Sequence, residues 1–153
     1  MSLVSGAKYR HTNLIAHDWR RLAAFYEHVF GCTPVPPERD QQGEWLERAS
    51  GVKNAHLRGA HLRLPGCGSD GPTLEVYQYA ETVPQDLPVA NRAGYGHLAF
   101  SVDNVDAAVE AVVSQGGSRL GEVVTRDVPD VGTLHFTYAR DPEGNILELQ
   151  NWS

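Results

Sequence analysis

The chain has 153 residues, of which 41% are hydrophobic and 21% are charged. This length fits one compact domain, or two half-size modules that share a core, and the composition excludes a disordered chain. The net charge of −6, with no cluster of Lys and Arg, argues against nucleic acid as a partner. No apolar run is long enough to cross a bilayer and the first residues lack a signal-like pattern, so we expect a cytoplasmic location and no membrane partner.

Histidine is more informative in this sequence than cysteine. The two cysteines, Cys32 and Cys67, do not form a CxxC pair. We therefore expect neither a disulfide framework nor a zinc–thiolate site, although one bridge between the two stays open. Seven histidines are present. The question is whether any of them lie where a metal-binding cluster can form.

The first half of the chain predicts a strand, an amphipathic helix and further strands. Residues 9–16 are typical of a strand, and apolar residues recur at helical spacing after Asp18. Asp18 is a suitable N-cap, and Gly31 is a suitable residue at the C-terminal end of the helix. Two further strands are predicted at 55–64 and 73–79.

Residues 32–54 form the least regular stretch. It contains prolines at positions 34, 36 and 37, followed by a polar run. We expect a loop or lid here, with a short helix around Trp45, Leu46 and Glu47. Residues 81–94 contain two prolines and a glycine, and we interpret them as a linker.

The second half opens as the first does. Residues 95–102 predict a strand, and Asn104 can cap a helix that ends at Gly116 and Gly117. The clearest later strands are predicted at 133–139 and 145–152. Between the helix and the final strand, each half has room for two strands, of which 55–64 and 133–139 are the clearer ones. Each half therefore has the order β-α-β-β-β.

The two halves form an internal repeat with an offset of 86 residues. This offset places His11 on His97, Asp18 on Asn104, and Gly31 on Gly117. We predict an α+β fold in which two tandem β-α-β-β-β modules form a curved mixed sheet. Residues 1–153 are then a single domain, with module one at about 8–80, the linker at 81–94 and module two at about 95–153.

Four ionisable side chains occupy equivalent places in this repeat. His11 and His97 lie in the opening strands, and Glu75 and Glu148 lie in the final strands; alternation places all four away from the helix layer. A carboxylate among core residues is costly unless its charge is compensated. Two imidazoles and two carboxylates around one divalent cation remove that cost, and the donor set suits Ni, Co, Zn, Mn or Fe.

An ordinary structural role is the alternative for each of these four residues taken singly, but it does not explain why the pair occurs twice. We therefore predict that the four are metal ligands around which the sheet curves. The other five histidines do not repeat, and we expect them to be structural or exposed. Among these five, His135 is the one expected nearest to the pocket.

Several motifs carry a resemblance to a known family. They are His11–Leu14 with Phe25 and Tyr26 behind it, Gly94–Asp103, and Asp141–Leu149. These motifs resemble the vicinal oxygen chelate superfamily, which includes glyoxalases, bleomycin resistance proteins and dioxygenases. The order His, Glu, His, Glu is most similar to bacterial glyoxalase I. The match is strong over 94–149, good over 9–31 and weak over 32–72.

The resemblance implies a function as well as a fold. It implies that His11, Glu75, His97 and Glu148 hold one divalent metal ion, and that Glu148 also acts as the catalytic base. The enzyme would then be a lyase or isomerase of glyoxalase I type, which stabilises an enediolate or enolate of a small thioester or hemithioacetal. The resemblance and the paired modules also favour a homodimer.

Three alternatives lie within the same superfamily. One is an epimerase like methylmalonyl-CoA epimerase, which moves a proton next to a thioester. Another is an extradiol ring-cleaving dioxygenase, which holds Fe(II) with two His and one Glu, so that a fourth ligand at Glu75 argues against it. The third is a non-enzymatic drug-binding resistance protein, which generally lacks the ligands that this chain retains.

Overall fold

The computed structural model describes residues 3–153. These residues group into two compact units. The first unit consists of the residues up to Ala23 together with Gly31–Thr82. The second unit consists of Ala24–Phe30 together with Val83–Ser153. Helix residues 24–30 thus group with the second unit, although the sequence repeat assigns them to module one. Within the described residues, no helix combines the length and apolar character needed to span a membrane.

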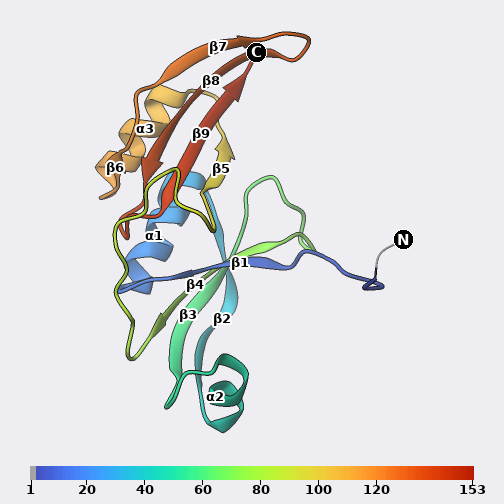
Figure 1. The fold of residues 1–153 in the computed structure, drawn as a ribbon, viewed down its shortest axis with the longest axis vertical. Helices are drawn as coiled ribbons and strands as arrows, with labels where there is room; N and C mark the ends of the chain where they lie inside the picture. Colours follow the sequence, from blue (N-terminus) through green and yellow to red (C-terminus); the bar gives the residue numbers. More distant parts are fainter. Residues whose placement is uncertain (1–2) are drawn as a thin grey trace. The chain divides into compact units, whose positions relative to one another are not determined.

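The first unit is built on a four-stranded mixed sheet (Figure 1). Its strands lie in the order β1-β4-β3-β2, with β1 parallel to β4 and the other pairs antiparallel. The elements of this part of the chain are β1 (His11–Ile15), α1 (Trp19–Phe30), β2 (Thr33–Gln42), α2 (Glu44–Ser50), β3 (His56–Arg63) and β4 (Thr73–Tyr79). The predicted β-α-β-β-β order is confirmed for residues 11–79, with the short helix α2 inserted between β2 and β3.

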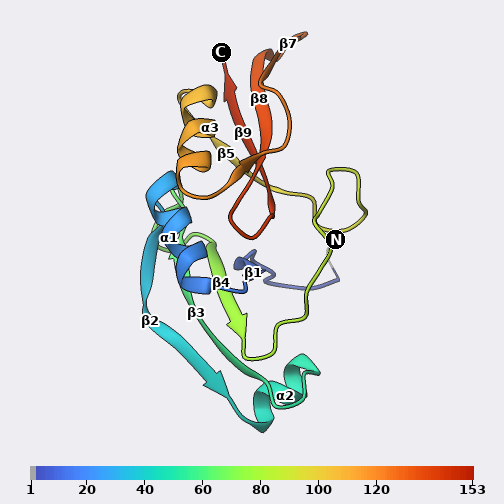
Figure 2. The same cartoon turned by 90° about the vertical axis from the view of Figure 1, so that its left-hand side faces the viewer.

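Strand β2 corrects the expectation of a loop or lid at 32–54. Prolines lack a backbone N–H, and the three prolines of this segment lie in an edge strand, where one side of the backbone has no sheet partner. The pairing with β3 also shifts register between Val35 and Arg39, which accommodates the proline-rich part. The short predicted helix is present as α2, at the end of the β2–β3 hairpin (Figures 1 and 2).

Helix α2 contributes to a small apolar cluster in the first unit. Leu46 from α2 is buried with Ala55, Leu57 and Tyr77, and Tyr79 packs against them. Leu57 lies opposite Tyr79 in the antiparallel pair of β3 and β4. Helix α2 therefore packs against the end of the sheet through this cluster.

The second unit repeats this architecture. The sheet order is β5-β9-β8-β6, with β7 also pairing with β8, and β5 is parallel to β9 as β1 is to β4. The elements are β5 (Leu98–Ser101), α3 (Val105–Ser114), β6 (Ser118–Arg119), β7 (Val124–Val128), β8 (Gly132–Arg140) and β9 (Ile146–Trp152). The expected second strand is split into β6 and β7, and both parts use β8 as partner.

Helix α3 covers one face of this second sheet (Figures 1 and 2). It begins as predicted, because Oδ1 of Asn104 accepts a hydrogen bond from the backbone N–H of Ala107 at 2.9 Å. The buried side of the helix and the facing strands supply apolar side chains to one core. These are Val105, Val109, Val112, Ala139, Leu147 and Leu149. Alternation along β9 places Glu148 on the other face of the sheet.

The end of α1 also contributes to the core of the second unit. The rings of Phe30 and Phe100 are stacked with their centroids 3.9 Å apart. Phe25 and Tyr26 are fully buried beside them. This aromatic cluster explains why the last two turns of α1 group with the second unit.

Candidate functional site

His11 and Glu75 form the first of two His–Glu pairs. Parallel pairing of β1 with β4 sets His11 opposite Thr73 and Asn13 opposite Glu75. Nε2 of His11 lies 3.3 Å from Oε2 of Glu75. The imidazole is partly exposed, whereas the Glu75 side chain keeps only 10% of its surface. The first unit thus presents a nearly buried carboxylate with an accessible histidine beside it.

Glu75 has more polar neighbours than the sequence indicated. His61 lies directly opposite it in β3, with Nε2 at 2.9 Å from Oε1. The hydroxyl of Tyr77 donates to the same oxygen at 3.4 Å, and Nδ2 of Asn13 donates to Oε2 at 3.4 Å. Four polar side chains therefore surround one carboxylate.

Burial shapes the ionisation of this cluster. Desolvation lowers the pKa of His61, and the nearby charge of Glu75 opposes that shift. Burial, together with the charge of Glu75 and the hydrogen bond to it, raises the pKa of Tyr77 to about 12. Tyr77 therefore stays a neutral donor at physiological pH.

His97 and Glu148 form the second pair. Nε2 of His97 lies 3.0 Å from Oε2 of Glu148, whose side chain keeps 17% of its surface. His97 lies immediately before β5, one residue outside the strand that the sequence predicted to contain it. Tyr138 lies opposite Glu148 in the antiparallel pair of β8 with β9, and its ring is 5.1 Å from that of His97. Burial and the neighbouring Glu148 raise the pKa of Tyr138.

The two carboxylates occupy the same register position in their units. In the first parallel pair Asn13 lies opposite Glu75, and in the second Ala99 lies opposite Glu148, which reproduces the 86-residue offset of the repeat. The structure brings the four predicted residues together as two pairs, one in each unit. Among residues 3–153 it shows no group of three or more His, Cys, Asp or Glu side chains arranged to hold a metal ion. A shared four-residue site stays a prediction.

The donor chemistry of the two pairs fits a divalent metal ion. Each pair offers one imidazole nitrogen and one carboxylate, and each carboxylate lies on the sheet among apolar core residues. A His₂Glu₂ set is a mixed nitrogen and oxygen donor set of the kind that Zn, Ni, Co, Fe and Mn accept. Its two negative charges match a divalent cation. The residues present therefore fit the metal that the resemblance implies.

Sequence reasoning missed His61 and misplaced His135. His61 was expected to be structural or exposed, yet it contacts Glu75. The available signal was register, because an antiparallel hairpin between residues 55–64 and 73–79 sets a limited number of partners for Glu75. The expectation for His135 is wrong: its Nδ1 lies 2.6 Å from Oγ1 of Thr125, and its Nε2 lies 3.7 Å from Asp106 at the start of α3.

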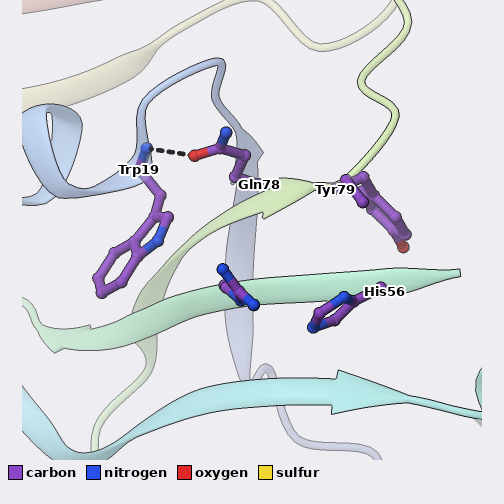
Figure 3. Close-up of a pocket in the computed structure, with 6 residues that line it drawn as sticks. Trp19, His56, Gln78 and Tyr79 are labelled. Atoms are coloured by element: carbon purple, nitrogen blue, oxygen red, sulfur yellow. Dashed lines mark hydrogen bonds between the residues drawn. The ribbon is translucent and has the colours of Figure 1, made fainter.

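The first unit also contains a pocket of about 240 Å³, which neither His11 nor Glu75 lines. Figure 3 shows its lining residues. The pocket is lined by Trp19, His56, Arg58, Gln78, Tyr79 and Ala80. The backbone N–H of Trp19 donates to Oε1 of Gln78 at 3.3 Å. His56 and Arg58 both pair with Asp40, at 2.6 and 3.2 Å. Strand alternation places these two side chains on the face opposite His61, so the pocket and the candidate metal ligands are separate.

Two known proteins are similar to this chain over most of its length. A protein 37% identical over 149 residues, covering 95% of this chain and 91% of its own length, is a probable lactoylglutathione lyase of Vibrio cholerae. A 2-epi-5-epi-valiolone epimerase of an Actinomyces species is 32% identical over 147 residues, covering 92% of this chain and 77% of its own length.

The fold has solved counterparts as well. A glyoxalase family protein from Bacillus cereus superposes with a TM-score of 0.82 at 19% identity, covering 99% of this chain and 98% of its own. The family model described as Glyoxalase/Bleomycin resistance protein/Dioxygenase superfamily matches residues 8–149. With a match over nearly its whole length, the chain belongs to the glyoxalase/bleomycin resistance protein/dioxygenase superfamily.

Proposed function

We propose that the protein is a metal-dependent lyase or isomerase of glyoxalase I type that acts on a small thioester or hemithioacetal. In this proposal His11, Glu75, His97 and Glu148 hold one divalent metal ion. The observation that carries it is the repeated His–Glu pair, with Nε2-to-carboxylate distances of 3.3 and 3.0 Å at equivalent register positions. Relatives named as probable lactoylglutathione lyases support the same reaction class.

Burial supports a cation at these carboxylates. Glu75 is only 7% exposed and sits between the apolar residues Leu74 and Val76. A buried carboxylate is expensive without a compensating charge, and a neutral imidazole supplies only a dipole. A divalent cation bound by both pairs would compensate Glu75 and Glu148 together.

The proposed reaction is a proton transfer at a carbon next to a carbonyl group. When bound, the metal supplies a Lewis acid that stabilises the enediolate or enolate formed on loss of that proton. Glu148 is the proposed base, because a carboxylate can take the proton at one carbon and return it at the next. The residues opposite Glu148 in the neighbouring strands are Ala99 and Tyr138. The corresponding residues opposite Glu75 are Asn13 and His61, which offer the Glu75 carboxylate more polar contacts.

An epimerase is the second candidate function. The observation that favours it is the 32% identity to a 2-epi-5-epi-valiolone epimerase over most of this chain. Epimerisation needs the same removal and return of a proton next to a carbonyl group. The two functions differ in the substrate, so a substrate test separates them.

The central experiment uses the full chain loaded with Ni²⁺, Co²⁺, Zn²⁺ or Mn²⁺. The hemithioacetal of glutathione and methylglyoxal is offered first, and thioester formation is followed by absorbance. Turnover supports the glyoxalase reaction. The epimerase is supported by a different result: no turnover of the hemithioacetal with any metal, together with incorporation of deuterium from deuterated water next to the carbonyl group of an epimerisable substrate.

Glu75→Gln separates these functions from a ring-cleaving dioxygenase. A dioxygenase that needs two His and one Glu should keep its metal and its turnover after this change. The proposed four-ligand site should lose metal affinity or turnover. Glu122→Gln, at an exposed position outside the site, is the matched control.

We also propose that the protein is a homodimer. Each unit presents one four- or five-stranded sheet with one His–Glu pair. A sheet curves around a site only when a second module faces it, and we propose that a second copy of the chain supplies the facing module. Light scattering after size exclusion at micromolar concentration should give twice the mass of the 16.8 kDa chain, and a monomer would contradict the dimer.

A further inference from the structure

We propose that His61 is a positioning residue that holds Oε1 of Glu75 and thereby directs Oε2 toward His11. This inference rests on the proposed function, because it assigns the orientation of a proposed metal ligand. It concerns a residue on β3 that does not recur in the sequence repeat.

The two carboxylate oxygens of Glu75 contact different residues. Oε1 faces Nε2 of His61 at 2.9 Å and the hydroxyl of Tyr77 at 3.4 Å. Oε2 faces Nε2 of His11 at 3.3 Å, with the amide of Asn13 at 3.4 Å. The shorter contact is made to the oxygen that points away from His11. His61 therefore restrains the rotation of the carboxylate, and Oε2 is the oxygen presented beside the proposed ligand His11.

The two oxygen contacts of Nε2 indicate the tautomer that His61 adopts. Nε2 of His61 lies 2.9 Å from Oε1 of Glu75 and 2.6 Å from the hydroxyl of Tyr77. Without a hydrogen, Nε2 would turn its lone pair toward a carboxylate oxygen, which is repulsive. With a hydrogen on Nε2, the imidazole donates into the space between the two oxygens, while Tyr77 donates its own hydrogen to Oε1. The neutral ring must therefore carry its hydrogen on Nε2.

The second unit has no equivalent of this arrangement. The residue opposite Glu148 in the antiparallel partner strand is Tyr138, where Glu75 has His61. The residue opposite it in the parallel partner strand is Ala99, where Glu75 has Asn13. Apart from the proposed ligand histidines, Glu75 thus faces a polar residue on each of its two neighbouring strands, whereas Glu148 faces one only on β8. Because of this difference, we expect the Glu75 carboxylate to keep one orientation and the Glu148 carboxylate to move more freely when it transfers a proton.

A restraint of this kind is expected to affect metal affinity. Carboxylate ligands are commonly held by hydrogen bonds from residues behind them, and loss of such a partner typically costs about 10- to 100-fold in metal affinity or activity. His61 is placed to supply this bond. A leucine at position 61 fills similar space but cannot donate, whereas a glutamine can donate through its amide.

The first test reads the tautomer in metal-free protein. Side-chain ¹H–¹⁵N spectra are recorded at pH 8 on full-length protein treated with a chelator, and the signals of His61 are assigned by their loss in His61→Gln. The expected result is a neutral ring with its hydrogen on Nε2. A hydrogen on Nδ1 instead would overturn the proposal, because His61 could then not donate to Glu75.

The second test measures Ni²⁺ binding by calorimetry. His61→Leu should weaken binding about 10- to 100-fold, and His61→Gln should restore it to within about threefold of the original protein. His56→Leu is the matched control, because His56 lies on the same strand, on the opposite face and against Asp40. Unchanged binding in His61→Leu, or an equal loss in His56→Leu, would overturn the positioning role.

The outcomes separate this inference from the function on which it rests. If the original protein binds Ni²⁺ and His61→Leu binds it equally well, the positioning role fails and the proposed function stands. If the original protein binds no Ni²⁺, Co²⁺, Zn²⁺ or Mn²⁺, the proposed function fails and the role of His61 fails with it. Selective weakening with rescue by glutamine supports both.

Discussion

The hydroxyl of Tyr26 donates a hydrogen bond to Oδ2 of Asp141 at 2.9 Å, across 115 positions of the chain. Tyr26 lies in the last turns of α1, and Asp141 begins the turn between β8 and β9. Oδ1 of Asp141 accepts from the backbone N–H groups of Glu143 and Asn145 at 2.9 and 3.0 Å. The Asp-Pro-Glu-Gly-Asn motif is therefore a buried anchor for α1 in the second unit, not part of the candidate site.

Tyr26→Phe should destabilise the fold without affecting metal binding. The change removes one donor from a buried carboxylate and leaves the ring packing in place, so we expect a loss of about 1–2 kcal/mol in the free energy of unfolding. Urea denaturation measures it. Tyr95→Phe, at a fully exposed position, is the control and should leave stability unchanged. A Tyr26→Phe protein as stable as the original would contradict the anchoring role.

Stability should also depend on pH through Asp141. Burial raises the pKa of this carboxyl above its ordinary value, against the lowering effect of hydrogen bonds from Asn145 and Tyr26. Between the unfolded pKa of about 3.9 and the raised folded pKa, the folded state binds more protons than the unfolded state. The stability that Asp141 contributes is thus fully present below the unfolded pKa and falls as pH rises through the folded pKa.

Asp141→Asn isolates this pH dependence because asparagine does not titrate. The free energy of unfolding of the original protein minus that of the variant should be larger at pH 4 than at pH 7. Urea denaturation at both pH values measures the difference, and subtraction cancels the other titrating groups. An unchanged difference, or a larger one at pH 7, would show that burial does not dominate at Asp141.

Gly59→Ala should lower the stability of the protein by disturbing the packing of β3 against β4 in the first unit. A Cβ atom at this position would collide with the backbone carbonyl of Val76 and the ring of Tyr77 in the adjacent strand. We expect a loss of about 2–3 kcal/mol, from strain and from displacement of Tyr77 beside Glu75. Gly68→Ala is the control, because its added Cβ meets no atom within 4 Å. Equal thermal stability of the two variants would contradict this packing.

Much of the architecture could be predicted because the repeat carries two independent copies of the same signals. Asp18 and Asn104 mark the two helix starts, and the capping bond from Asn104 is present as expected. Strand β4 has the predicted bounds, 73–79. Alternation along β1 and β4 was enough to place His11 and Glu75 on one face, where they lie 3.3 Å apart.

The remaining features depend on tertiary context. Prolines at 34, 36 and 37 indicate a loop locally, but the edge of a sheet tolerates them, and so β2 forms there. The contact of His61 with Glu75 depends on the exact register between β3 and β4. A shift of this register by one residue would abolish the contact.

Metal content is the most direct test of the central claim, that the repeated His–Glu pairs hold one metal ion. Protein purified without a chelator is analysed for Ni, Co, Zn, Mn and Fe, alongside His11→Ala, His97→Ala and the control His28→Ala, whose histidine lies in α1 outside both pairs. The account predicts close to one metal ion per chain in the original protein and in His28→Ala, and strong loss in both pair variants. A metal-free original protein that also gains no activity from added Ni²⁺, Co²⁺, Zn²⁺ or Mn²⁺ would contradict it.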